Sequence, residues 1–147
     1  MRFIASTLAI AIACSGCATR RAAPEFLPVA GGPARPFSAA VRVNGFLLLS
    51  GQIGTDSTGR VVPGGIQAET RQTMENIRAV LQRSGSSFDR VVKCTVFLAD
   101  MSEWAAMNEV YVTFFTEGRR PARSAAGANG LALNARVEIE CIAVDSR

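Results

Sequence analysis

The stretch Val137–Val144 constrains the fold most, because its side chains follow the two-residue period of a β-strand. Apolar residues alternate there with Glu138 and Glu140, so both carboxylates are expected on one face. Arg123 lies a short distance before this strand, in a run of small residues that contains Gly127. Glycine is a poor helix former, so the run is expected to be a second strand that lets another backbone approach closely.

Arg123 and Glu138 are the candidate chemical groups of these two strands. On adjacent strands, a guanidinium fork and a carboxylate could hold a small carboxylate ligand and a water molecule side by side. The alternative is an Arg–Glu pair that closes a sheet edge, since most charged side chains are simply solvated. The residues alone leave both interpretations open.

The remaining elements follow from periodicity, caps and turn residues. Asn44-Gly45 is typical of a two-residue hairpin turn. Asp100 is expected to cap a second helix with Glu103 in a reciprocal capping box, and the aromatic stripe from Trp104 onward is expected to be core. The expected ranges are strands 38–43 and 46–49, a helix over 66–83, a strand over 91–98 covered on both faces, and a helix from 100 to about 117.

This order of elements predicts an α+β fold with one mixed β-sheet and two helices packed on one face. The chain has 147 residues, enough for one domain. The second face of the sheet, from which Glu138 projects, still needs a cover. A cyclic oligomer would supply it.

Composition excludes several classes of function. The chain has no histidine, which removes Ser-His and Cys-His catalysis and the usual zinc sites. Its four cysteines lack metal-cluster spacing, so we expect no metal and no cofactor. The net charge is +4, but the arginines are scattered, so no nucleic-acid partner is expected. Cys94 and Cys141 each lie mid-strand, and two buried free thiols are favoured over a disulfide.

The N-terminus resembles an export signal followed by a linker. Residues 1–16 form a positively charged start and a short apolar run, and Ser15-Gly16-Cys17 is typical of a bacterial lipoprotein boundary. We expect lipidation at Cys17 and a location in the periplasm or cell envelope, with membrane attachment through this anchor only. An ordinary cleaved signal is the alternative. The proline-rich residues 17–36 are expected to be an extended linker, and residues 37–147 the domain.

Four blocks in order resemble the RidA/YjgF family of enamine and imine deaminases. They are residues 36–41, 49–53, 91–100 continuing to 117, and 121–144. The resemblance covers nearly all of the chain after about Pro28. It implies the chorismate-mutase-like fold of this family and a homotrimer with sites in the clefts between subunits.

The resemblance also implies roles for individual residues. Arg123 matches the arginine that binds the substrate carboxylate, and Glu138 matches the acid that holds the water. Phe37, Ser50 and Asn108 match substrate-binding or neighbouring positions. Many relatives have tyrosine in place of Phe37, and cysteine two residues after the arginine, where this chain has alanine. These departures are expected to change the substrate range.

The implied reaction is hydrolysis of a 2-imino acid, such as 2-iminobutanoate or 2-iminopropanoate, to a 2-oxo acid and ammonia. An iminium carbon is already electrophilic, so orientation of the carboxylate and of one water suffices. The competing hypothesis is an exported module that binds a small carboxylate without turnover. A chaperone-like or ribonuclease role is a third possibility, and the lack of basic clusters argues against the nuclease.

Overall fold

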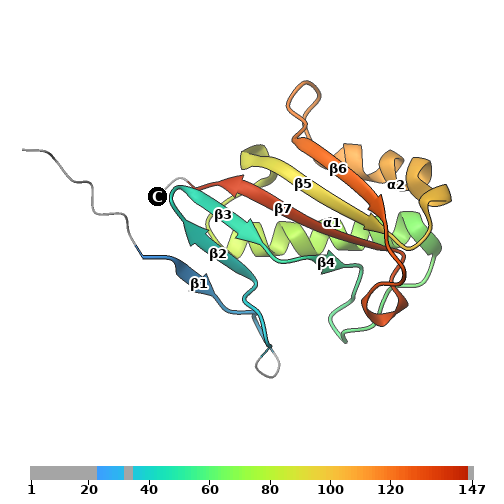
Figure 1. Cartoon of the computed structure of the whole chain (residues 1–147), viewed down its shortest axis with the longest axis horizontal. Helices are drawn as coiled ribbons and strands as arrows, with labels where there is room; N and C mark the ends of the chain where they lie inside the picture. Colours follow the sequence, from blue (N-terminus) through green and yellow to red (C-terminus); the bar gives the residue numbers. More distant parts are fainter. Residues whose placement is uncertain (1–22, 32–34, 146–147) are drawn as a thin grey trace, which may run out of the picture.

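A computed structural model describes residues 23–31 and 35–145 (Figure 1). The predicted signal peptide, Cys17 and the first part of the linker lie outside the described residues, so the lipid anchor stays a prediction. The strands are β1 (Glu25–Leu27), β2 (Ala40–Val43), β3 (Phe46–Leu49), β4 (Gln52–Ile53), β5 (Val91–Leu98), β6 (Ala122–Gly127) and β7 (Val137–Val144). The α-helices are α1 (Gly65–Arg83) and α2 (Trp104–Tyr111).

One mixed sheet contains all seven strands, in the order β1-β2-β3-β7-β5-β6 with β4 also paired to β7. β5 and β6 are parallel, and the other pairs are antiparallel. The parallel pair follows from α2, because a crossover connection is needed to bring the chain back in the same direction. The predicted α+β fold with a mixed sheet is confirmed.

The core lies between the sheet and the two helices. α1 buries an apolar stripe at helical spacing that includes Ile66, Met74, Ile77 and Leu81. It packs against alternate residues of the strands, among which Leu47, Val96, Leu98, Val137 and Ile139 are fully buried. α1 lies behind β7 and β4, and α2 lies beside β6 (Figure 1).

The opposite face of the sheet has no cover within the described chain. Phe46, Leu48 and Val144 are 45%, 40% and 41% exposed there. β5 was predicted to be covered on both faces, but the chain buries only alternate residues of it. An apolar sheet face left open in this way favours contact with another chain.

The hairpin between β2 and β3 has the predicted turn. Asn44 and Gly45 have φ angles of 50° and 79°, the left-handed conformations that a type I′ turn requires. The prediction of an extended linker over 17–36 omitted β1, which pairs antiparallel with β2 through Phe26 and Val41. Three residues are too few to show a period of their own, so this pairing depends on the neighbouring strand.

The predicted capping box forms only in part. Asp100 accepts a hydrogen bond of 2.8 Å from the backbone N–H of Ser102 and caps the short 3₁₀ helix Met101–Glu103, which leads into α2. Glu103 does not return to Asp100. Its carboxylate pairs instead with Arg136 at 2.6 Å, because the guanidinium is a stronger partner than a backbone amide.

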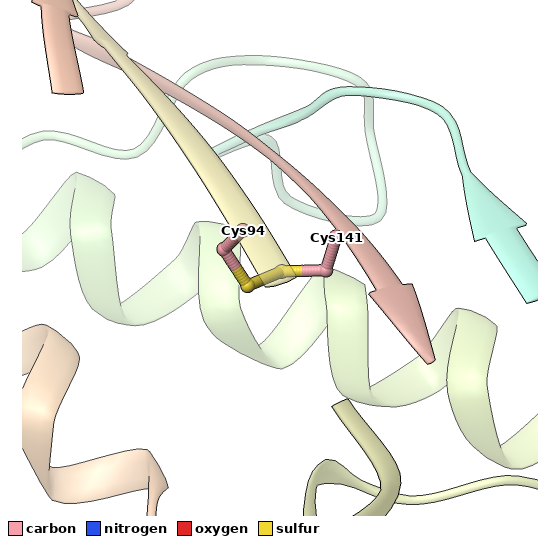
Figure 2. The surroundings of a disulfide bond; sticks show 2 residues. All are labelled: Cys94 and Cys141. Atoms are coloured by element: carbon pink, nitrogen blue, oxygen red, sulfur yellow. A yellow bond between two sulfur atoms is a disulfide. The ribbon is translucent and has the colours of Figure 1, made fainter. Parts of the chain in front are cut away.

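Cys94 and Cys141 form a disulfide, so the prediction of two free thiols is wrong (Figure 2). The two residues face each other directly across the antiparallel pair of β5 and β7, and both lie on the helix side of the sheet. The sequence did not show that these two strands are neighbours. Direct opposition of two cysteines on adjacent strands brings their β-carbons close enough for a bond.

Candidate functional site

Arg123 lies on β6, which is an edge strand of the sheet. It pairs in register with Cys94 of β5, and paired residues of neighbouring strands point to the same face, so its side chain lies on the helix side. There its Nη1 donates to Oδ1 of Asn108 on α2 at 2.5 Å. Among the described residues the other guanidinium N–H groups have no hydrogen-bond partner. One nitrogen of the Arg123 guanidinium is therefore fixed by Asn108, and its other N–H groups remain available as donors to a ligand.

Two aromatic rings of α2 surround the same guanidinium. Its central carbon lies 4.8 Å from the ring centre of Tyr111 and 5.8 Å from that of Trp104. Tyr111 is 3% exposed, and its hydroxyl has no hydrogen-bond partner within the described part of the chain. Burial raises the pKa of the Tyr111 hydroxyl to about 12, against the opposing effect of the Arg123 charge. The ring is therefore neutral at physiological pH and holds the guanidinium through its π face.

These aromatic residues were predicted to be core, and sequence reasoning missed their contact with Arg123. Tyr111 is core as well, whereas Trp104 is 42% exposed. The available signal was spacing: residues 104, 108 and 111 lie on one face of a helix, and Asn108 was already a candidate. A polar candidate flanked by aromatic residues on one helix face indicates that all three residues can contact the same group.

Glu138 lies on β7, on the uncovered face of the sheet, because its neighbours Val137 and Ile139 are buried on the helix side. Its carboxylate lies over the backbone of Gly51, where an added β-carbon would be 2.0 Å from Oε1. Burial raises the pKa of the Glu138 carboxyl above its ordinary value, and the charge of Glu140 raises it further. A carboxylate with a raised pKa is a better proton acceptor at neutral pH than an ordinary surface glutamate.

Arg123 and Glu138 do not meet within one chain. The hypothesis of a ligand held between them on adjacent strands of one chain is not met, since β5 lies between β6 and β7. They also project from opposite faces, Arg123 with Cys94 toward the helices and Glu138 with Phe97 away from them. The pairing that would close a sheet edge is excluded by the same geometry.

The structure places Ser50 and Phe37 apart from Arg123. The Ser50 hydroxyl donates to the backbone carbonyl of Ser38 at 2.6 Å, so its proton is used within its own subunit. Ser50 precedes Gly51 directly and therefore lies on the Glu138 side of the candidate site. Phe37 is 53% exposed in the segment before β2. Candidate residues thus form two groups, one around Arg123 and one around Glu138.

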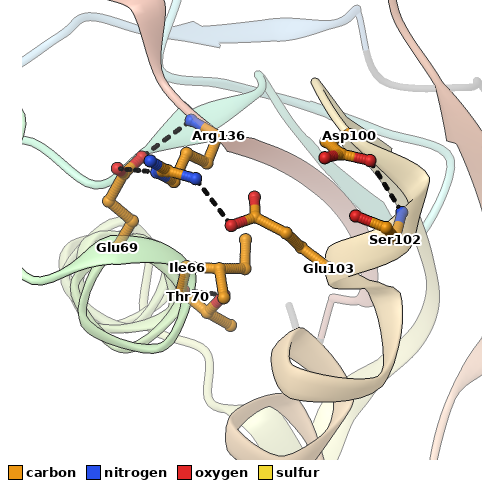
Figure 3. Close-up of polar contacts among 7 residues, drawn as sticks. All are labelled: Ile66, Glu69, Thr70, Asp100, Ser102, Glu103 and Arg136. Carbon is orange, nitrogen blue, oxygen red and sulfur yellow. Dashed lines mark hydrogen bonds and ion pairs between the residues drawn. The ribbon is translucent and has the colours of Figure 1, made fainter.

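An ion network around the buried Glu69 positions the start of β7 (Figure 3). Glu69 of α1 is 5% exposed and accepts the backbone N–H of Arg136 at 2.8 Å. The Arg136 guanidinium lies between Glu69 and Glu103, at 3.7 Å and 2.6 Å. Because Arg136 precedes Glu138 by two residues, this network ties the strand that carries the candidate base to both helices.

A cavity of about 650 Å³ lies elsewhere, between β4 and α1, with Gln52, Asn76 and Arg83 in its lining. It includes neither Arg123 nor Glu138. Within residues 23–31 and 35–145, no group of three or more His, Cys, Asp or Glu side chains is placed to hold a metal ion. In the same ranges, no helix has the length and apolarity needed to cross a membrane.

Comparison with known proteins links this geometry to a family. A family model described as Endoribonuclease L-PSP matches residues 29–145. The 2-iminobutanoate/2-iminopropanoate deaminase of Mus musculus is 46% identical over 110 residues, which are 74% of this chain and 81% of that protein. A RutC family protein of Pyrococcus horikoshii is 45% identical over 112 residues, 76% of this chain and 88% of that protein. The crystal structure of RidA from an Antarctic Psychrobacter bacterium has a TM-score of 0.71 at 38% identity, covering 81% of this chain and 94% of that one.

Proposed function

The chain belongs to the Endoribonuclease L-PSP family (the RidA family), and on this basis we propose that it hydrolyses 2-imino acids to 2-oxo acids and ammonia. Support comes from relatives at 44–46% identity that are named 2-iminobutanoate/2-iminopropanoate deaminase. The observation that carries the proposal is Arg123, which Asn108 and two aromatic rings hold on an edge strand with free N–H donors. This is the arrangement that a planar carboxylate requires.

In the proposed reaction Arg123 binds the substrate carboxylate and Glu138 holds a water molecule beside C2. Glu138 takes a proton from the water as the water oxygen bonds to C2, and passes that proton to the imine nitrogen, which gives a tetrahedral species with one hydroxyl and one amino group on C2. The C2–N bond then breaks as the hydroxyl loses its proton to Glu138 and the nitrogen receives that proton, so ammonia leaves and the 2-oxo acid remains. The carbon is electrophilic at the start, so orientation and one proton acceptor account for the chemistry.

We propose that two subunits build each site. Arg123 and Glu138 lie on opposite faces of one sheet, and a single substrate touches both only when a second copy supplies one of them. β6 is an edge strand, and the uncovered face exposes the apolar side chains of Phe46, Leu48 and Val144, which favours such a contact. The family resemblance points to a homotrimer, whose heterologous interfaces would give three equivalent sites.

An exported, lipid-anchored form is proposed from the leader and from Cys17. The Cys94–Cys141 disulfide supports it, because disulfides persist in oxidising compartments such as the bacterial periplasm. Mass spectrometry of the mature N-terminus should find cleavage before Cys17 and an acylated cysteine. An unmodified chain that begins elsewhere would exclude the anchor.

The function is tested by measuring ammonia and 2-oxo acid released from freshly generated 2-iminobutanoate. Arg123→Lys keeps the charge but loses the planar fork, so it should lower kcat/KM about ten- to hundredfold, as expected for a charge-assisted bond of about 1.5–3 kcal/mol. Ligand binding without any release of ammonia by the wild type would instead indicate a binding module. Equal rates for wild type and Arg123→Lys would exclude the assigned role of Arg123.

A further inference from the structure

An apolar strip runs along the helix side of β6 beyond Arg123. Alternation puts Ala125 and Gly127 on the same face as Arg123, so the strand carries only a methyl group and a hydrogen there. Trp104, beside Arg123, and Met101, beside Gly127, are 42% and 46% exposed. The side chain of Met101 reaches to 3.1 Å from the position that a β-carbon at Gly127 would occupy.

The two aromatic partners of Arg123 differ in how deeply they are buried. Tyr111 is buried in the core and already stacks on the guanidinium at 4.8 Å, closer than Trp104 at 5.8 Å. Both rings contact the cation, but the indole is 42% exposed, which is high for the largest apolar side chain. Its exposed part remains available to a molecule bound at Arg123.

We infer that Trp104 is a specificity-determining residue, and that the site takes 2-imino acids with bulky apolar side chains, branched or aromatic, in preference to short ones. The inference rests on the proposed function, in which Arg123 binds the carboxylate. The substrate side chain begins two bonds from that carboxylate, so it lies within reach of the indole. The small residues of β6 leave the strand side of this position without a large side chain, and Met101 extends the apolar surface.

The kinetic test compares full-chain wild type, Trp104→Ala and Trp104→Phe on imines that an amino-acid oxidase generates from phenylalanine and from alanine. Wild type should prefer the phenylalanine-derived imine. Trp104→Ala should lower kcat/KM for the phenylalanine-derived imine about tenfold, in the range expected for losing one side of an apolar pocket. The same variant should lower kcat/KM for 2-iminopropanoate about twofold or less. Trp104→Phe should restore most of the loss, because a phenyl ring preserves the stacking surface.

Glu109→Ala is the matched control, since it truncates a side chain of the same helix that bonds Gln67 of α1 at 2.7 Å instead of Arg123. It should leave the ratio between the two substrates unchanged. If Trp104→Ala lowers kcat/KM equally for both substrates, the inference is contradicted, because Trp104 would then only support Arg123. A wild type that prefers 2-iminopropanoate would overturn the inference.

A binding measurement separates this inference from the proposed function. Trp104 is the only tryptophan of the chain, so its fluorescence reports directly on a ligand at this position. 3-Phenylpropanoate should shift the emission at about tenfold lower concentration than propanoate does, and Arg123→Lys should weaken both responses. If no imine is hydrolysed but this difference is found, the proposed turnover fails and the ligand class stands. Equal responses to both acids would overturn the ligand class, whether or not the protein is an enzyme.

Discussion

Glu138 lies in an environment that differs from that of an ordinary surface carboxylate. Burial and the neighbouring charge of Glu140 both disfavour its ionised form, and Lys93 of β5 lies on the same face, where it bonds Ser124 at 2.7 Å. A group with a raised pKa is a stronger base, but it acts only above that pKa. Folding stability has the corresponding sign: the protonated carboxyl is favoured in the folded chain, and its contribution is lost as pH rises through the folded pKa.

The pH dependence of hydrolysis should therefore report Glu138. The rate should fall on acidification with a midpoint above 4.5, the ordinary value for glutamate. Glu138→Gln should lower kcat about a hundredfold or more, because an amide can hold water but cannot take its proton, and the remaining activity should lack this acid limb. The variant should unfold at pH 7 at the same temperature as wild type or higher, since it removes a buried charge. A lower melting temperature would indicate that Glu138 stabilises the fold.

Gly51 allows the Glu138 carboxylate to lie against the backbone. Its φ is not in the left-handed region, so alanine fits the backbone, and the three atoms nearest to the added β-carbon all belong to the Glu138 side chain, with Oε1 at 2.0 Å. Gly51→Ala should displace the carboxylate and lower kcat about tenfold or more, since misplacement by about 1 Å costs up to a hundredfold. Combining Gly51→Ala with Glu138→Gln should add nothing to the loss of Glu138→Gln alone. Additive losses would mean that Gly51 acts on another group.

At the scale of elements, the disulfide joins β5 and β7, two neighbouring inner strands of the sheet (Figure 2). Cys94 and Cys141 are 47 residues apart in sequence, so the bond closes a long loop in the unfolded chain. Reduction, or the double change to alanine, should lower the free energy of unfolding by about 2–4 kcal/mol. Digestion of the unreduced protein should yield one peptide pair joined through these cysteines. Two free thiols and no effect of reductant on the melting temperature would contradict the assignment.

α1 carries two glutamates that pair with arginine in different surroundings. Glu69 is buried and binds both the backbone and the side chain of Arg136 (Figure 3), whereas Glu75 meets Arg78 on the surface at 3.2 Å. Glu69→Ala should lower the free energy of unfolding by about 1–3 kcal/mol, because a backbone N–H loses its partner. Glu75→Ala, the matched control, should change it by about 0.5 kcal/mol or less. Urea denaturation of the two variants measures the difference.

The elements that could be predicted have a pattern in their own sequence, whereas those that were missed are defined by pairing with strands elsewhere in the chain. α1 and β7 carry enough residues to show their periods, and the hairpin has its turn residues at Asn44-Gly45. β1 and β4 have three and two residues, and pairing with β2 and β7 defines them. Arg123 and Glu138 were named from sequence, but their placement on opposite faces depends on the strand order. That order depends on the crossover through α2, which puts β6 beside β5, and on the insertion of β7 between β3 and β5, and no local pattern contains either.

For the whole molecule, the arrangement of candidate groups is incomplete in one copy. One edge strand offers Arg123, and the uncovered face offers Glu138 with an apolar surface beside it. A contact that joins unlike surfaces of identical chains closes into a ring when the rotation allows it. The family resemblance implies a ring of three, so light scattering is expected to give three times the monomer mass. A monodisperse monomer would remove the shared site together with the trimer.

Mixed trimers test the shared site directly. Arg123→Ala and Glu138→Ala chains should each be inactive when pure. If every site takes Arg123 from one subunit and Glu138 from its neighbour, co-expressed chains form some sites in which neither residue is altered. Random assembly of equal amounts makes about one site in four intact, so the mixture should recover about a quarter of the wild-type activity. Sites built within single chains would stay inactive at every mixing ratio, because each chain lacks one of the two residues. Recovery above the sum of the two pure variants therefore requires that Arg123 and Glu138 act from different subunits.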